Sequence, residues 1–338
     1  MTAIDPHTHI YPGQFIADVR AGRFGRTASI EADAQGEWLI TRGKVLGRDS
    51  ELRNKLTPLY YELPSRFADM ERMGVAHQVL SIGPAMTLYT LEAEANRELA
   101  ASLNDGLTAL AREYPDKFSC MATVPLQAPE AAAAELERAC ANGHLGVMIA
   151  SNVAGKNLDD PGLDVFWAKA ETLDAPVFVH PTNVLGSEDR LKDFYLRNFI
   201  GNPLDTTVAV ACLIFGGVMD RFPGLRFYLS HVGGFVPWIR GRWQHGYGER
   251  REPKAHGAKD PEQYFGRFYY DTIIHNADCF EFAAKTLGAE RILYGTDYPA
   301  DMGYHQPARD IPGLSRLPEA EQEMILTTNA RRVYGLSG

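Results

Sequence analysis

The chain has 338 residues, of which 45% are hydrophobic and 23% are charged, and its formal net charge is −9. This length and composition allow a large buried core and argue against extended disorder. The acidic balance and the lack of a basic stripe argue against a nucleic-acid partner.

No targeting or membrane-spanning segment is expected. The N-terminus has no basic segment followed by an apolar run, and no uncharged apolar stretch reaches about 18 residues. The four cysteines are widely spread and form no CxxC pair, so we interpret them as reduced thiols. The sequence therefore predicts a cytoplasmic protein without a membrane partner.

Short runs rich in β-branched and aromatic residues alternate with longer amphipathic runs, a pattern typical of parallel strands joined by helices. The short runs predict strands at Thr2–Asp5, Ala76–Ile82, Phe118–Val124, Gly146–Ala150, Val177–His180, Arg226–His231, Phe268–Asp271 and Arg291–Gly295. Eight such strands predict a closed (β/α)8 (TIM) barrel, with an open doubly wound sheet as the alternative. No GxGxxG follows the first strand, which disfavours a dinucleotide-binding sheet.

The regular spacing breaks after the first predicted strand, where residues 12–62 are polar, Gly-rich and weakly periodic. We expect one domain over residues 1–338, with 12–62 as an insertion on the face where barrel active sites are built. Insertions of this length are usually functional or disordered. We expect a lid or pocket wall with short strands of its own.

The strongest chemical motif is Asp5-Pro6-His7-Thr8-His9, directly after the first predicted strand. Side chains two positions apart point the same way along an extended chain, so His7 and His9 can bind one ion together. Imidazole suits zinc and other borderline divalent metals. An HxH pair alone is weak support, because such pairs also occur by chance.

Three further predicted strands end in or just before residues of the types that bind metal ions, namely His180, His231 and Asp297. In a barrel these side chains would meet at the carboxyl ends of the strands. Each could instead be an isolated capping or core residue. We expect His7, His9, His180 and Asp297 to hold one divalent ion, zinc first and manganese as the alternative.

His231 is then the natural acid/base group, since imidazole titrates near neutral pH. Its other interpretations are a fifth metal ligand or a residue that orients the metal's water. His275 lies just past the seventh predicted strand and is a candidate for lining the substrate pocket.

These motifs, in this order, resemble the amidohydrolase superfamily, in particular the aminocarboxymuconate-semialdehyde decarboxylase-like family. The similarity runs from the HxH motif to Asn329-Ala330 and includes Phe178-Val179-His180-Pro181, Ser230-His231-Val232-Gly233-Gly234 and Gly295-Thr296-Asp297-Tyr298-Pro299. The resemblance implies a single-metal barrel that removes a carboxylate without oxidation. It also implies that Arg242 is offered across a homodimer interface to a substrate carboxylate, and that Arg48 is a second such arginine. A surface arginine on a solvated helix is the alternative for Arg242.

Two positions depart from the enzymes that act on aminocarboxymuconate semialdehyde. Those enzymes carry an aromatic residue directly after the His-Pro of the fifth strand and another after the Asp-Tyr-Pro of the eighth. This chain has Thr182 and Ala300 there. The resemblance therefore implies a reshaped pocket that fits a bulkier or differently shaped substrate.

We accordingly expect a metal-dependent carboxy-lyase for an aromatic or muconate-type acid. His231, helped by Asp297, would protonate the carboxylate-bearing carbon before CO2 leaves. The alternatives are hydrolysis of a ring-fission product or a lactone, hydration of an unsaturated dicarboxylic acid, and a metal-bound protein that only binds its ligand.

Overall fold

The computed structural model describes residues 3–45, 48–187 and 189–337. Its central strands are parallel and mostly buried, as expected when crossover helices cover the faces of a parallel sheet. One sheet has the order β1-β5-β6 and the other β10-β9-β8-β7. Their bounds are β1 (Ala3–His9), β5 (Val75–Ser81), β6 (Phe118–Cys120), β7 (Val147–Ala150), β8 (Val177–His180), β9 (Phe227–Leu229) and β10 (Phe268–Tyr270).

Isolated parallel bridges join the two sheets into a closed ring. Ala122, just after β6, pairs with Val147 of β7. On the other side, Ile292 pairs with Tyr270 of β10, and Tyr298 pairs with Thr8 of β1. The segment from Ile292 to Tyr298 is therefore the eighth stave, and the predicted (β/α)8 barrel is confirmed.

The eighth stave differs from the predicted strand Arg291–Gly295, because it contacts its neighbours at single points rather than along a ladder. Close packing explains this: a Cβ on Gly295 would lie 2.8 Å from the Cβ of His7. The backbone also turns into the left-handed region at Asp297, with φ at +57°. The first strand is longer than predicted, because β1 continues beyond Asp5 and contains both His7 and His9.

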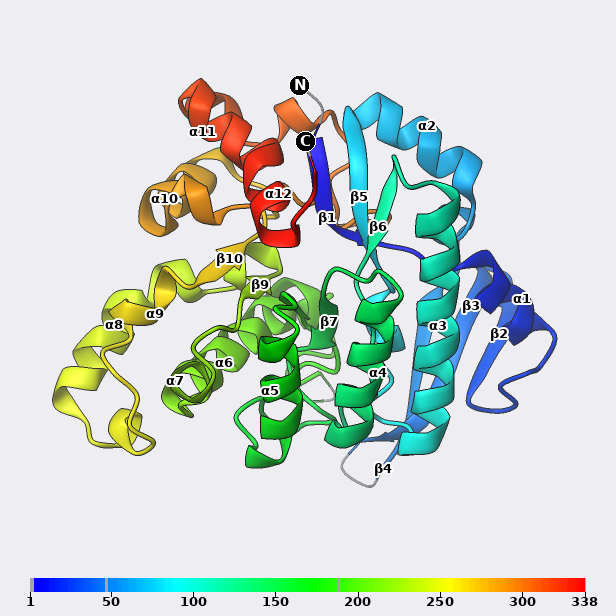
Figure 1. Cartoon of the computed structure of the whole chain (residues 1–338), viewed down its shortest axis with the longest axis horizontal. Helices are drawn as coiled ribbons and strands as arrows, with labels where there is room; N and C mark the ends of the chain where they lie inside the picture. Colours follow the sequence, from blue (N-terminus) through cyan, green and yellow to red (C-terminus); the bar gives the residue numbers. More distant parts are fainter. Residues whose placement is uncertain (1–2, 46–47, 188, 338) are drawn as a thin grey trace.

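Helices surround the ring (Figure 1). Their bounds are α2 (Leu63–Met73), α3 (Ala93–Glu113), α4 (Pro129–Ala141), α5 (Asp164–Thr172), α6 (Asn202–Phe215), α7 (Val218–Arg221), α8 (Val236–Glu249), α9 (Glu262–Phe265), α10 (Ala277–Leu287), α11 (Glu319–Glu323) and α12 (Asn329–Tyr334). α6 and α7 are separate helices, and Gly217 between them adopts a φ of +75°.

The segment after β1 contains a helix and a small antiparallel sheet that lie beside α3 (Figure 1). It comprises α1 (Gly13–Arg20), β2 (Ala28–Asp33), β3 (Gly36–Val45) and β4 (Arg48–Lys55), with the order β2-β3-β4. Short strands of its own were expected in this insertion. The sheet has alternating charges on its exposed side, such as Arg42 with Glu31 and Glu51.

One helical stretch, Arg197–Phe215, is long and apolar enough to cross a membrane by length and composition alone. It contains two charged residues, Arg197 and Asp205. Its inner face, including Val210 and Leu213, belongs to the barrel core. This is the packing of a core helix.

A fully buried arginine in α2, the helix that follows the insertion, links this helix to the barrel strands. Arg66 of α2 donates to Thr8 Oγ1 at 3.1 Å, to Gln78 Oε1 at 2.9 Å and to the carbonyl of His9. Its guanidinium lies 4.8 Å from the ring centre of Tyr298. Burial lowers the pKa of Arg66 to about 10, which still leaves it charged at neutral pH.

Replacing Arg66 should destabilise the barrel beside the first strand. In Arg66→Met the His9 carbonyl and the Gln78 side-chain oxygen lose their buried donor, so we expect the free energy of unfolding to fall by about 2–4 kcal/mol. Urea denaturation followed by circular dichroism measures this. The matched surface change Arg97→Met, at an exposed pair with Glu94, should leave the midpoint nearly unchanged. Equal midpoints for the two variants would contradict this role of Arg66.

Candidate metal centre and active site

Three imidazoles and one carboxylate meet at the carboxyl ends of the barrel strands. Nε2 of His9 lies 3.1 Å from Oδ1 of Asp297, Nε2 of His7 lies 3.3 Å from the same oxygen, and Nε2 of His180 lies 3.9 Å from it. All four residues are at least 93% buried. The structure thus brings together the four residues that the sequence predicts as metal ligands.

The other ring nitrogen of each histidine is already engaged. Nδ1 of His7 lies 2.6 Å from Asp271 Oδ2, and Nδ1 of His180 lies 3.0 Å from the Pro181 carbonyl. Nδ1 of His9 contacts Ser81 Oγ at 2.9 Å and the Ile82 carbonyl at 3.0 Å. Such contacts orient an imidazole and leave Nε2 as the free donor of an electron pair.

These atoms fit a divalent cation. Nε2 of His7 and of His180 are buried without a hydrogen-bond partner among the described residues. Buried polar atoms are normally paired, so two unpaired nitrogens aimed at one carboxylate oxygen indicate a missing partner. Three nitrogens and a carboxylate are also a common donor set for a catalytic divalent ion.

The pKa shifts within the cluster also indicate a metal site. Burial opposes charge on His7, yet the carboxylates of Asp297 and Asp271 outweigh it and raise its pKa to about 10. Burial and the neighbouring imidazoles hold the pKa of His180 well below its usual range. Against the opposing effect of burial, His7 and His231 keep the pKa of Asp297 well below its usual range. Asp297 is therefore ionised, which is the state a metal ligand requires.

His231 approaches the cluster from a different side. Its Nε2 lies 3.6 Å from Oδ2 of Asp297, whereas the three other histidines face Oδ1. Mutual distance alone gives another grouping, because ligand atoms of His7, His180, His231 and Asp297 all lie within 4.8 Å of one another. We favour His9 over His231 as a ligand, since His9 has an anchored Nδ1 and lies closest to Asp297.

Asp271 is a candidate functional residue that the sequence analysis did not identify. Its carboxylate is fully buried, contacts His7 Nδ1, and accepts from the backbone N–H groups of His231 and Val232, each at 2.7 Å. It therefore connects one ligand to the backbone of the acid/base candidate. The available signal was its position at the end of the seventh predicted strand.

Several residues of this site have strained backbone conformations. His231, Val232, His275 and Asp297 all have φ between +54° and +57°. Non-glycine residues seldom adopt this region, and they hold it where the surroundings impose it. At His231 and Val232, the hydrogen bonds that the backbone N–H groups donate to Asp271 stabilise this conformation.

Two cavities meet at Asp297. The smaller, of about 280 Å³, is mostly apolar and is lined by His231, His275, Phe199, Phe235, Trp238 and Met302 among others. The larger, of about 530 Å³, reaches His9 and His180 and is bounded by Leu52 and Asn54 of β4. His275 thus lines a pocket as the sequence suggests, with its ring edge-on to Tyr304.

The two predicted arginines are not part of this cluster within one chain. Arg242 lies exposed on α8 and lines neither cavity. Arg48 begins β4, but its side chain lies outside the described part of the structure. The roles assigned to both stay predictions.

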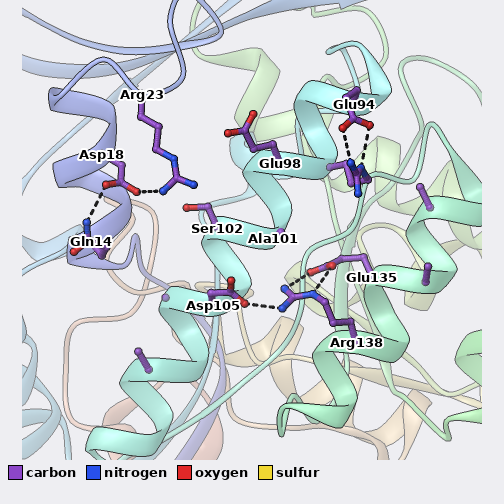
Figure 2. A pocket seen from close by; sticks show the side chains of 15 residues that line it. Gln14, Asp18, Arg23, Glu94, Glu98, Ala101, Ser102, Asp105, Glu135 and Arg138 are labelled. Atoms are coloured by element: carbon purple, nitrogen blue, oxygen red, sulfur yellow. Dashed lines mark hydrogen bonds and ion pairs between the residues drawn. The ribbon is translucent and has the colours of Figure 1, made fainter.

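A larger hollow, of about 880 Å³, lies elsewhere, between α1, α3 and α4 (Figure 2). Its arginines are already paired: Arg23 with Asp18, Arg97 with Glu94, and Arg138 with both Asp105 and Glu135. No histidine or cysteine lines it. We assign this surface no chemistry.

Comparisons with known proteins agree over the whole chain. The amidohydrolase family model (Amidohydro_2) matches residues 4–336. The chain is 31% identical over 337 residues to the 2-amino-3-carboxymuconate-6-semialdehyde decarboxylase of Dictyostelium discoideum, covering 98% of this chain and 91% of that protein. It is 29% identical over 308 residues to the gamma-resorcylate decarboxylase of Rhizobium sp. (strain MTP-10005), covering 85% and 90%.

A solved structure shares the fold. It is a dihydroxybenzoic acid decarboxylase from Polaromonas sp. JS666 with bound manganese and the inhibitor 2-nitroresorcinol. The TM-score is 0.78 at 22% identity, covering 99% of this chain and 97% of that one. With the family model and the Dictyostelium relative, the conclusion is that this chain belongs to the amidohydrolase superfamily, in its aminocarboxymuconate-semialdehyde decarboxylase-like family.

Proposed function

We propose that this chain is a metal-dependent, non-oxidative decarboxylase of an aromatic or unsaturated carboxylic acid. The full-length similarity to two decarboxylases with such substrates supports this reaction over hydrolysis or hydration. The main observation in support of this reaction is that the two oxygens of the Asp297 carboxylate face different groups. One oxygen faces His7, His9 and His180, and the other faces His231 beside an apolar cavity.

The metal would be held by His7, His9, His180 and Asp297. When bound, a divalent cation supplies the positive charge that grips a substrate carboxylate and an adjacent oxygen. Zinc is our first choice because the site is rich in imidazole. Manganese is the alternative, supported by the related Polaromonas structure that contains it.

His231 would act as the acid. It delivers a proton to the carbon that bears the carboxylate, forming a C–H bond and making that carbon tetrahedral. The C–C bond to the carboxylate then breaks, CO2 leaves, and the bonding pair restores the conjugated system. Asp297 would orient His231, while Asp271 would hold its backbone through the His231 N–H group.

The smaller cavity fits the ring or diene of the substrate. Its apolar walls exclude water from the reacting carbon, and His275 offers a polar contact at its rim. We propose that residues 12–62 form part of the pocket wall, since β4 bounds the larger cavity.

Metal removal tests the centre. Dialysis against a chelator should abolish CO2 release from 2,6-dihydroxybenzoate and related acids and should lower the melting temperature, because a bound ion stabilises the folded state. Adding Zn2+ or Mn2+ separately should restore both, and the ion that gives the higher activity identifies the preferred metal. Unchanged activity of a sample proved metal-free by elemental analysis would exclude a metal mechanism.

Matched substitutions separate the ligand from the acid. His180→Asn should lose the metal and the activity together. His231→Asn should retain nearly all the metal while CO2 release falls by about 10²–10⁴-fold. Elemental analysis and a CO2 assay on the same samples make the comparison. Loss of metal from the His231 variant would assign it as a ligand and refute its role as the acid.

We further propose a homodimer in which Arg242 binds the substrate carboxylate of the partner's site. This accounts for an arginine that lines neither of the two cavities at Asp297 in its own chain. Guanidinium binds carboxylate through two parallel hydrogen bonds, which suits a substrate acid.

Mixed dimers test this arrangement. His231→Asn and Arg242→Gln subunits should each be inactive alone. Co-expressed in equal amounts, they should recover about a quarter of the wild-type activity, because half the dimers are mixed and each has one intact site. If Arg242 acts within its own subunit, every site lacks one residue and no activity returns.

A further inference from the structure

Two loops at the metal centre meet the N-terminal part of α6. One loop follows His180 at the end of β8, and the other contains His231 and follows β9. In this part of α6, the side chains of Asp205 and Thr207 are only 5% and 6% exposed. Buried polar groups are normally hydrogen-bonded, and both of these residues have partners outside their own helix.

The carboxylate of Asp205 holds the loop after β8. Its Oδ1 accepts from the backbone N–H of Leu185 at 3.0 Å. Its Oδ2 accepts from Asn152 Nδ2 at 2.9 Å and from the hydroxyl of Ser151. Asn152 Nδ2 also donates to the Thr182 carbonyl at 2.9 Å. The loop is therefore fixed at two points shortly after the metal ligand that ends β8.

The hydroxyl of Thr207 holds the turn that contains His231. It donates to the Pro203 carbonyl at 2.7 Å and accepts from the backbone N–H of Phe235 at 2.8 Å. The helix and the turn are in close contact, because a Cβ on Gly234 would lie 2.1 Å from the Pro203 carbonyl oxygen. Since Phe235 and His231 both line the smaller cavity, this hydrogen bond fixes one wall of that cavity.

The neighbouring threonine provides an internal comparison. Thr206 is fully buried and donates to the Asn202 carbonyl at 3.1 Å. This is the same bond to a carbonyl four residues back that Thr207 makes. Among the described residues, the hydroxyl of Thr206 has no partner in another element. The two threonines thus differ in the N–H that Thr207 accepts from Phe235.

We propose that the N-terminal part of α6 positions both sides of the active site. Asp205 acts on the metal ligand His180, whose Nδ1 contacts the Pro181 carbonyl in the loop that Asp205 holds. Thr207 acts on the acid His231, because a shift of its turn moves the imidazole away from the carbon it protonates. Both are positioning residues. This inference rests on the proposed metal centre and decarboxylation and adds residues that hold their geometry.

A pair of threonine variants tests the side of the acid. Thr207→Val keeps the shape of the side chain and removes the acceptor of the Phe235 N–H, whereas Thr206→Val removes only a bond within the helix. In metal-loaded protein, Thr207→Val should lower kcat for CO2 release from 2,6-dihydroxybenzoate at least about tenfold, with KM and bound metal within about twofold of wild type. Thr206→Val should match the wild type, and Thr207→Ser, which retains the hydroxyl, should recover kcat. Equal effects of the two valine variants overturn the role of Thr207.

The variant Asp205→Asn tests the side of the metal. Its amide nitrogen would face a donor, so the loop should loosen and the dissociation constant for Zn2+ should rise at least about tenfold, as for other residues that orient a metal ligand. Glu135→Gln is the matched control, because Glu135 is also buried and accepts from Asn104 at 2.6 Å between α3 and α4. The control should lose stability and keep its zinc affinity. Competitive titration with a chelator measures both affinities, and unchanged affinity in Asp205→Asn rejects its role.

Hydrogen exchange on the protein without substrate separates this inference from the proposed reaction. Exchange of the Phe235 N–H in Thr207→Val, and of the Leu185 N–H in Asp205→Asn, should accelerate at least about tenfold. Neither should change in the two control variants, and mass spectrometry on short overlapping peptides measures both. If the wild type releases no CO2 from the acid, decarboxylation of that acid fails, while exchange and zinc affinity still decide the positioning. Unchanged exchange at both amides overturns it.

Discussion

The structure depends on placing four imidazoles and two carboxylates together where almost no water reaches. Isolated charges in such surroundings are strongly disfavoured unless each has a partner. Here Asp271 has several donors. Within the described part of the chain, the Asp297 carboxylate faces ring nitrogens alone, and two of these have no hydrogen-bond partner. A divalent cation resolves this imbalance, because it neutralises Asp297 and accepts the free electron pairs together.

The same requirement explains why the backbone is strained around the site. The carboxylate of Asp271 reaches β1 through His7 and fixes the turn after β9 through His231 and Val232. One buried side chain therefore sets the relative positions of a metal ligand and the acid/base candidate. The hydrogen bonds that His231 and Val232 donate to Asp271 offset the strain of the left-handed backbone in that turn.

The sequence predicted those parts of the molecule that follow from local pattern. Alternating apolar runs located all eight staves, and histidines or aspartates at strand ends identified the cluster. The eighth stave lacks a ladder because Gly295 packs against His7, a contact between the two ends of the chain that no local pattern contains. The break between α6 and α7 depends on the positive φ of Gly217, which the helical periodicity did not indicate.

Roles that arise from three-dimensional neighbours were harder to predict. Asp271 looked like an ordinary strand end, because its importance comes from residues far away in sequence. Arg242 is exposed on α8 and lines neither cavity at Asp297, so its role in a partner's site stays a proposal. The cytoplasmic location likewise stays a prediction.

A metal ion at this centre would stabilise the closure of the barrel in addition to its role in the reaction. The last stave meets β1 through a few single hydrogen bonds, such as those from His9 N to Tyr298 O and from Asp297 N to His7 O. That joint has little backbone pairing to resist opening. His9 and Asp297 lie on its two sides, 288 residues apart in sequence. An ion bound by both residues would link the first and last staves where the barrel closes, much as a cross-link that closes a long loop restricts the unfolded chain.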